Sequence, residues 1–203
     1  MAVGDQQNIA IRLLQEIFQE EGRKMKFDWL INKHQRKHFG DLYEIIDNIF
    51  ISLGGDMEGV SNKREQKLSP DCYFGGQLNF LFEYDELQHF TEYKKLALEK
   101  YPRELQYNFT VNTYIDYCKL YSNDAIKKGP PGYRKSKKDF RFEYGRAAQR
   151  AYLDAFRDLL PVKYGLNPTL RIAEFEVGFI LKDDNKSRER MVQILNQRKV
   201  INI

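Results

Sequence analysis

The sequence has few cysteines and no long apolar run. Its 203 residues include two cysteines, Cys72 and Cys118, which are too few for a disulfide scaffold or for a zinc site built from four cysteines. No apolar stretch approaches the ~18–20 residues that span a bilayer. The N-terminal residues also lack the basic leader and apolar segment of a secretory signal. We therefore expect a protein of the reducing cytoplasm that has no contact with a membrane.

The motifs of several common enzyme classes are absent as well. The sequence contains no GxGxxG turn, no GxxxxGK[ST] phosphate loop, no HExxH, no GxSxG and no paired CxxC. These motifs carry dinucleotide binding, ATP binding, zinc proteolysis and serine hydrolysis. The sequence therefore gives no support to a dehydrogenase, a P-loop ATPase, a zinc protease or an α/β-hydrolase.

Charge of one sign does not dominate, but the basic residues are unevenly placed. The chain has 33 Lys and Arg against 29 Asp and Glu, a net charge of +4. Within 127–141, Asp139 is the only acid among the basic residues Lys127, Lys128, Arg134, Lys135, Lys137, Lys138 and Arg141. Such a block either binds phosphate groups through release of counterions or forms a solvated loop. We predict a loop or lid here that contacts nucleic acid.

The spacing of apolar residues predicts helices on both sides of a short β segment. Helical spacing is found at 7–20, 27–38, 40–53, 91–101 and 143–160, and the charged segment 182–199 fits a last helix. Gly54-Gly55 is expected to end the third of these helices. Thr91 is a candidate N-cap for the fourth.

Two short apolar runs, 72–74 and 79–84, predict a β-hairpin, because Gly75-Gly76 between them is a strong turn signal. Alternation over 169–176 predicts a further strand. The expected fold class is therefore α/β, with a small mixed β-sheet flanked by helices.

We expect this sheet and its helices to form a core over residues 40–181, with the basic segment inserted in it. An N-terminal helical extension would precede it at 1–39, and a charged tail or helix would follow at 182–203.

Acidic residues mark the ends of the predicted hairpin. Asp71 begins its first strand, and Glu83 and Asp85 end the second, where residues two apart face the same side. Strand pairing can place Asp71 opposite them, and three converging carboxylates repel one another unless a cation neutralises them. Oxygen ligands of this kind suit Mg²⁺ or Mn²⁺. Gln88 and His89 follow and could orient or deprotonate a water molecule.

The segment 69–90 resembles the PD-(D/E)xK nuclease superfamily, which has the restriction-endonuclease-like fold. Within it, the segment is similar to the branch of very-short-patch-repair and small homing-type endonucleases. The resemblance rests on Pro70-Asp71, Glu83-Tyr84-Asp85 and Gln88-His89. It extends loosely to Glu44, to Asp154 and Arg157, and to Arg171-Ile172.

The resemblance implies a metal-dependent endonuclease that hydrolyses DNA phosphodiester bonds in restriction, repair or anti-phage defence. Asp71 with Glu83 or Asp85 would hold the Mg²⁺ or Mn²⁺ ion, and Gln88 or His89 would position the attacking water. Glu44 would supply a further acid. Cleavage of both strands usually needs two active sites, which a homodimer or a protein complex would provide.

Two departures from the superfamily pattern keep other functions open. Asp85 occupies the position of the superfamily's lysine, and Glu86 replaces a glycine that usually follows. A DNA-binding subunit of a larger complex that has lost catalysis fits these changes. A protein-docking scaffold whose segment 182–199 binds a partner is a third function; it would show no salt-dependent DNA binding.

Several of these residues also have a purely structural interpretation. Asp154 and Arg157 are three apart on a predicted helix, the spacing of an ordinary ion pair. Glu44 suits an exposed helix surface as well as a catalytic role. Arg171 would contact phosphate, or pair with Glu174 or Glu44. We expect His34 and His38 to be surface or DNA-facing residues.

Overall fold

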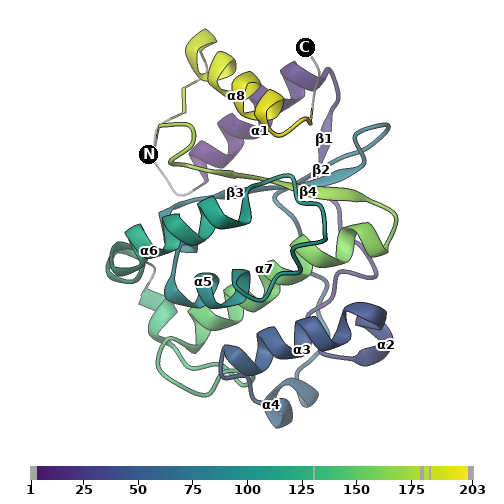
Figure 1. The fold of residues 1–203 in the computed structure, drawn as a ribbon, viewed down its shortest axis with the longest axis vertical. Helices are drawn as coiled ribbons and strands as arrows, with labels where there is room; N and C mark the ends of the chain where they lie inside the picture. Colours follow the sequence, from purple (N-terminus) through teal and green to yellow (C-terminus); the bar gives the residue numbers. More distant parts are fainter. Residues whose placement is uncertain (1–3, 130, 179–180, 183, 201–203) are drawn as a thin grey trace.

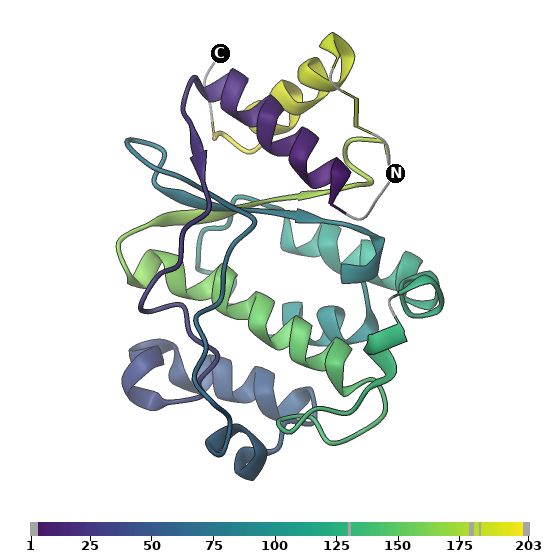
Figure 2. The same cartoon turned by 180° about the vertical axis from the view of Figure 1, so that it is seen from behind.

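The computed structural model describes residues 4–129, 131–178, 181–182 and 184–200. A four-stranded sheet lies between two layers of helices (Figures 1 and 2). The strands are β1 (Gly22–Arg23), β2 (Cys72–Phe74), β3 (Phe80–Asp85) and β4 (Asn167–Ala173). The α-helices are α1 (Asp5–Phe18), α2 (Arg36–Phe39), α3 (Tyr43–Ser52), α4 (Met57–Ser61), α5 (Glu92–Leu98), α6 (Val111–Lys128), α7 (Gly145–Lys163) and α8 (Asn185–Gln197). Short 3₁₀ helices are η1 (Gly40–Leu42), η2 (Leu87–His89) and η3 (Pro131–Arg134).

The strand order in the sheet follows the chain, β1-β2-β3-β4. The β1–β2 and β2–β3 pairs are antiparallel, whereas β4 runs parallel to β3. Parallel neighbours need a long crossover connection, and α5, α6 and α7 provide it. The sheet is therefore mixed, and the predicted α/β class with a small mixed sheet flanked by helices is confirmed.

The two faces of the sheet pack against different helices. Alternation along β3 sends Phe80, Phe82 and Tyr84 into an apolar cluster with α1 and α8. Leu81 faces the opposite cluster, which contains α3, α5, α6 and α7. Because every residue of β3 is buried, the acids Glu83 and Asp85 are carried into the interior on the α7 side.

Most of the predicted elements form. Residues 72–74 and 80–85 pair as the hairpin, with Cys72 opposite Phe82. Thr91 caps α5, since its Oγ1 accepts a hydrogen bond from Lys94 N at 3.2 Å. None of the described helices is long and apolar enough to cross a membrane.

The helix predicted at 27–38 is wrong except for its last turn, α2. This segment instead runs beside residues 62–68 (Figure 2), where Leu68 N donates to Leu30 O at 2.7 Å and Asn32 N to Gln66 O at 3.0 Å. Trp29 stacks on Tyr164 with ring centroids 4.9 Å apart. Tertiary contacts therefore fix this segment in place of helical hydrogen bonds.

Candidate functional site

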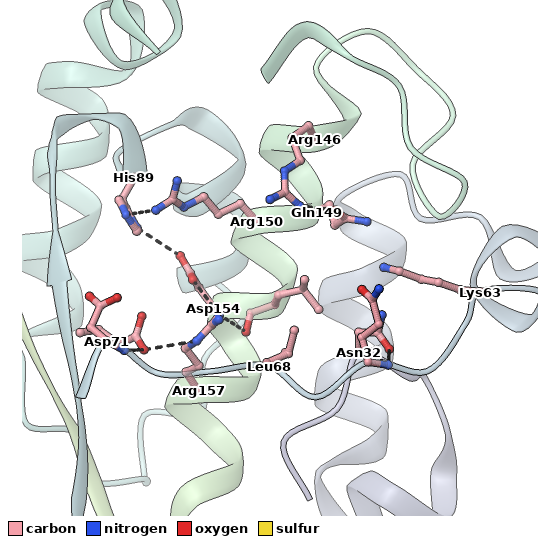
Figure 3. A pocket seen from close by; sticks show the side chains of 13 residues that line it. Asn32, Lys63, Leu68, Asp71, His89, Arg146, Gln149, Arg150, Asp154 and Arg157 are labelled. Atoms are coloured by element: carbon pink, nitrogen blue, oxygen red, sulfur yellow. Dashed lines mark hydrogen bonds and ion pairs between the residues drawn. The ribbon is translucent and has the colours of Figure 1, made fainter. Parts of the chain in front are cut away.

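A cavity of about 410 Å³ opens between α7 and the end of the β2–β3 hairpin (Figure 3). Helix α7 forms one wall, the hairpin end and η2 a second, and the two side-by-side loops at 27–35 and 62–68 a third. The lining residues are Asn32, Lys63, Gln66, Leu68, Asp71, Glu83, His89, Arg146, Gln149, Arg150, Leu153, Asp154 and Arg157. Most of these side chains are polar or charged, whereas pockets for small apolar ligands are lined mainly by hydrophobic residues, so this cavity suits a charged ligand.

Asp71 and Glu83 are neighbours across the β2–β3 pair. Asp71 N donates to Glu83 Oε1 at 3.3 Å, and Asp71 Oδ2 accepts from Tyr84 N at 2.8 Å. Burial raises the pKa of Asp71. Burial, with the nearby charge of Asp71, raises the pKa of Glu83 to about 8 although Arg157 opposes the shift. Both carboxyls therefore gain from a bound proton or cation.

Arg157 contacts Glu83 of this acidic pair without neutralising both carboxyl groups. Its Nε lies 3.2 Å from Glu83 Oε1, yet the geometry leaves this buried Nε without a hydrogen-bond acceptor. The guanidinium also reaches Ser69 O at 3.1 Å and Asp154 Oδ1 at 3.4 Å. Arg157 is therefore shared among several acceptors and leaves oxygen atoms of Asp71 and Glu83 available in the cavity.

Asp85 has a different environment, although it lies on the same face of β3. It is fully buried, and both its oxygens accept hydrogen bonds from Arg171 Nη1, at 2.8 and 2.9 Å. Burial opposes its ionisation, but Arg171 and His89 outweigh burial and lower the pKa of Asp85. Asp85 does not line the cavity, and its charge is neutralised by the protein itself.

Asp85 belongs to a buried ionic network behind the cavity. Arg171 Nε lies 2.6 Å from Asp158 Oδ1. Lys94 Nζ lies 3.4 Å from Asp154 Oδ2 and 3.7 Å from Asp158 Oδ2. Arg171 and Lys94 are 0% and 1% exposed. These two side chains supply the positive charge that the sequence led us to expect from a metal at Asp85.

Asp85, His89 and Asp154 offer ligand atoms that all lie within 4.8 Å of one another, a spacing that a metal ion could use. His89 Nδ1 is 2.9 Å from Asp85 Oδ1 and 3.6 Å from Asp154 Oδ2. On the other side of the ring, His89 Nε2 contacts Arg150 Nη2. A guanidinium can only donate, so Nε2 must accept and the ring hydrogen is assigned to Nδ1. A metal on Nδ1 would displace that hydrogen and force Arg150 away.

The opposite part of the cavity carries positive charge. Arg146 Nη1 donates to Gln149 Oε1 at 2.5 Å, and Arg150 Nη1 donates to Tyr133 Oη at 2.8 Å. Within the described part of the chain, neither arginine has a carboxylate in ion-pair contact. Arg146 and Arg150 thus lie on the part of α7 away from Asp71, whereas Arg157 and Asp154 of the same helix lie nearer to it (Figure 3). This arrangement can hold a phosphate group together with a divalent cation.

Several predicted site residues lie elsewhere. The Gln88 side chain donates to Glu86 Oε2 at 2.6 Å and does not line the cavity. Glu44 is exposed and pairs with Arg36 at 2.6 Å, also outside the cavity. Arg171 is in the interior with Asp85 and Asp158, so its side chain cannot reach a phosphate in solution.

The two remaining histidines are not surface residues. His34 and His38 are 9% and 8% exposed. His34 binds Tyr152 Oη at 2.5 Å and Asp47 Oδ1 at 3.0 Å. The expectation that they lie on the surface or face DNA is therefore corrected, because both pack among aromatic rings.

The basic segment lies beside the cavity without lining it. Lys128 pairs with Asp124 at 3.0 Å, and Arg141 Nε pairs with Asp56 at 2.9 Å. None of the basic residues from Lys127 to Arg141 is a lining residue; besides Lys128 and Arg141 these are Lys127, Arg134, Lys135, Lys137 and Lys138. The link to the cavity is the acid of the segment, since the buried Asp139 accepts from Lys63 and Gln149 at 2.6 Å each.

Arg146 and Arg150 of α7 were not predicted from the sequence, whereas Arg157 was named with Asp154, and the two form the ion pair that their spacing predicts, at 3.4 Å. Arg146, Arg150 and Arg157 share one helix face with Asp154, and the spacing 146, 149, 150, 153, 154, 157 is that of a continuous stripe. A polar stripe on an otherwise buried helix was a usable signal. Lys63 and Asn32 come from irregular loops, and no periodicity marks them.

A model of a protein family of unknown function (DUF7255) matches residues 48–184. The matched region contains every lining residue of the cavity except Asn32. No curated protein and no solved structure matches this chain.

Proposed function

The chain belongs to the family of unknown function DUF7255, and we propose that it is a metal-dependent nuclease that hydrolyses DNA phosphodiester bonds in this cavity. One observation carries the proposal. Two adjacent carboxyls with raised pKa, Asp71 and Glu83, share the cavity with Arg146 and Arg150, which lack carboxylate partners. A divalent cation on the acids and a phosphate on the arginines would satisfy both groups at once.

The chemistry assigns a role to each end of the cavity. Asp71 and Glu83 would hold Mg²⁺ or Mn²⁺, which polarises a phosphate oxygen and lowers the pKa of a bound water. Arg146 and Arg150 would bind the nonbridging oxygens of the phosphate. When Arg150 turns from His89 to the phosphate, Nε2 of His89 becomes free to accept a proton from water. Asp85, 2.9 Å from Nδ1, holds the ring in the required orientation.

The fold and the sequence motif support the same proposal. A mixed sheet flanked by helices agrees with the restriction-endonuclease-like fold that the resemblance of residues 69–90 implies. A homodimer would bring two such cavities to one duplex. We place the protein in the cytoplasm, because Cys72 and Cys118 are free, buried thiols that need no oxidising compartment.

A DNA-binding subunit without catalysis is a second candidate. The specific observation in its favour is that Arg157 Nε already lies 3.2 Å from Glu83, where a cation would be needed. If that arginine replaces the metal, the cavity binds phosphate without cleaving the bond.

Cleavage assays with matched variants separate these functions. The full chain is incubated with single-stranded DNA, linear duplex and supercoiled plasmid, in Mg²⁺, in Mn²⁺ and in EDTA. We expect metal-dependent cleavage that falls at least ~100-fold in Asp71→Asn and in Glu83→Gln. Glu44→Gln is the control, because Glu44 is an exposed acid outside the cavity.

Each other outcome has a distinct meaning. Salt-sensitive DNA binding without cleavage in any metal would favour the noncatalytic subunit. If the protein neither binds nor cleaves DNA, both candidates are contradicted. Equal activity of Asp71→Asn and wild type would remove this cavity as the site of reaction.

A further inference from the structure

We propose that a single nucleic-acid strand crosses Asp71 and runs between two hollows, with Lys24 and Lys26 binding it on one side and Arg146 and Arg150 on the other. This inference rests on the proposed function and narrows its substrate. The strand would continue on both sides of the cleaved bond, which makes the protein an endonuclease acting on unpaired DNA.

A second hollow adjoins the cavity at Asp71. Its volume is about 370 Å³, and it is formed by α1, the chain that follows β1 and the turn before β2. Its lining residues are Gln7, Lys24, Met25, Lys26, Ser69, Pro70 and Asp71. Among the residues that the structure describes, Asp71 alone lines both this hollow and the cavity. The acid with the raised pKa therefore lies at the junction of the two recesses.

The charges of the second hollow are available to a ligand. Lys24 and Lys26 are exposed, and among the residues that the structure describes neither forms a salt bridge. Nucleic-acid strands carry a phosphate at every nucleotide, and unpaired lysines bind them by releasing counterions. Cations on both sides of Asp71 therefore fit consecutive phosphates, whereas a substrate that ended at the cut would need cations on one side only.

Met25 adds an apolar contact between the two lysines. Its side chain is 43% exposed and lines the second hollow. An exposed methionine flanked by lysines fits a strand whose phosphates bind the charges while a base or sugar packs on the thioether.

The depth of the acids favours an unpaired strand. Glu83 and Asp154 are 4% and 3% exposed, so a phosphate must enter the recess to reach them. A single strand can bend into it, but duplex DNA is stiff over this length and resists such a bend.

Binding at a series of salt concentrations tests the strand path independently of cleavage. The probe is a fluorescein-labelled single-stranded DNA, and its anisotropy is measured in EDTA with the full chain. The slope of log K against log salt should become shallower by about 1.4 in K24A/K26A, because ~0.7 is lost per phosphate contact on a single strand. The slope should become shallower by a similar amount in R146A/R150A. K37A/K100A is the control, since both lysines are exposed and line neither recess.

Cleavage kinetics add a second readout. The substrates are the same oligonucleotide and bis(p-nitrophenyl) phosphate, a diester too small to reach Lys24 or Lys26. The kcat/KM for the oligonucleotide, divided by that for the small diester, should fall about tenfold in K24A/K26A, the equivalent of ~1.4 kcal/mol. The same ratio should stay unchanged in K37A/K100A.

The outcomes distinguish the strand path from the proposed function. If K24A/K26A and K37A/K100A give equal salt slopes, or if only R146A/R150A changes the slope, the path across Asp71 is overturned. If wild type hydrolyses neither substrate but the salt slope of K24A/K26A is still shallower by about 1.4, the strand path is supported and the proposed nuclease activity is contradicted. Absence of DNA binding overturns both.

Discussion

Two acids of one strand, Glu83 and Asp85, have opposite pKa shifts although both are buried and both face α7. Burial raises the pKa of Glu83 to about 8, while Arg171 and His89 together outweigh burial and lower that of Asp85. The difference comes from geometry, because both oxygens of Asp85 accept hydrogen bonds from Arg171 whereas Arg157 only approaches Glu83. Acids pushed apart in this way usually have different tasks. In the proposed function, Asp85 orients His89 and Glu83 binds the cation.

The raised pKa of Glu83 predicts a pH-dependent stability. Between pH 4.5, the ordinary pKa of a glutamate, and about pH 8, the raised pKa of Glu83, the folded protein keeps a proton that the unfolded chain releases. The stabilisation of the folded state by this proton is therefore complete at low pH. It is lost as the pH rises to about 8, by at most ~1.4 kcal/mol per pH unit. We expect Glu83→Gln to flatten this dependence of the free energy of unfolding, measured in urea across that window. Glu44→Gln should retain the wild-type slope, and a retained slope in Glu83→Gln would contradict the assignment.

Arg171 is predicted to be the most costly single charge to remove. Arg171→Met would leave Asp85 and Asp158 buried without their guanidinium partner, and breaking a buried ion pair costs about 3–5 kcal/mol. The exposed pair of Arg36 and Glu44 offers the comparison, because Arg36→Met should cost less than about 1 kcal/mol. Urea unfolding of both variants measures the difference. Similar midpoints would mean that water or Lys94 replaces the guanidinium.

Part of the site could be predicted from the sequence, because its residues are local in the chain. Asp71, Glu83 and His89 are close in sequence or opposite each other in a hairpin, so local spacing brings them into one cavity. The arginines of α7 reach this cavity through the β3–β4 crossover. Assigning them requires knowing which face of α7 meets the sheet, and the sequence alone does not supply that.

At the scale of elements, the spacing of apolar residues predicted most of the helices. Helices α1, α3 and α5 each bury one stripe and were predicted, and α7, which is buried over most of its surface, was predicted as well. The missed helix α6 buries Tyr114, Ile115 and Cys118, but Tyr117 and Tyr121 also pack against Phe175 on a neighbouring face. Aromatic residues on two faces obscured its period, and β1 is too short to show one.

The contact between α4 and the basic segment is tight enough to test by a single substitution. A Cβ at Gly59 would come 1.6 Å from Lys138 O, so Gly59→Ala must separate α4 from this segment. We expect a loss of about 1–3 kcal/mol in the free energy of unfolding. Gly132→Ala is the matched control, since a Cβ there meets nothing within 4 Å. If both variants unfold at the same urea concentration, the contact is looser than described.

The same substitution has a consequence for the cavity. Asp139, next to Lys138, holds Lys63 and Gln149 in place. A displaced segment would release both side chains at the cavity wall, so Gly59→Ala is also expected to weaken DNA binding more than Gly132→Ala does.

For the whole molecule, the sheet separates two apolar clusters, and the charged cavity opens on one side only. Helices α1 and α8 cover one face, and they place the two ends of the described chain on that side (Figures 1 and 2). The cavity lies on the other side, among the charges of α7. The C-terminal segment, highly charged in sequence, therefore contributes to the core through a narrow stripe that its composition concealed.

This arrangement predicts how α8 responds to substitution. Leu195 is fully buried in the cluster with β3 and β4, so Leu195→Ala should lower the free energy of unfolding by about 2–5 kcal/mol. Glu189, exposed on the same helix, should tolerate alanine within about 0.5 kcal/mol. Urea denaturation followed by tryptophan fluorescence compares them, because Trp29 lies on the far side of the sheet and reports whether the whole fold responds. If Leu195→Ala unfolds at the wild-type midpoint, α8 is not part of the cooperative fold. A helix that is free to bind a partner would then favour the protein-docking scaffold as the function of this segment.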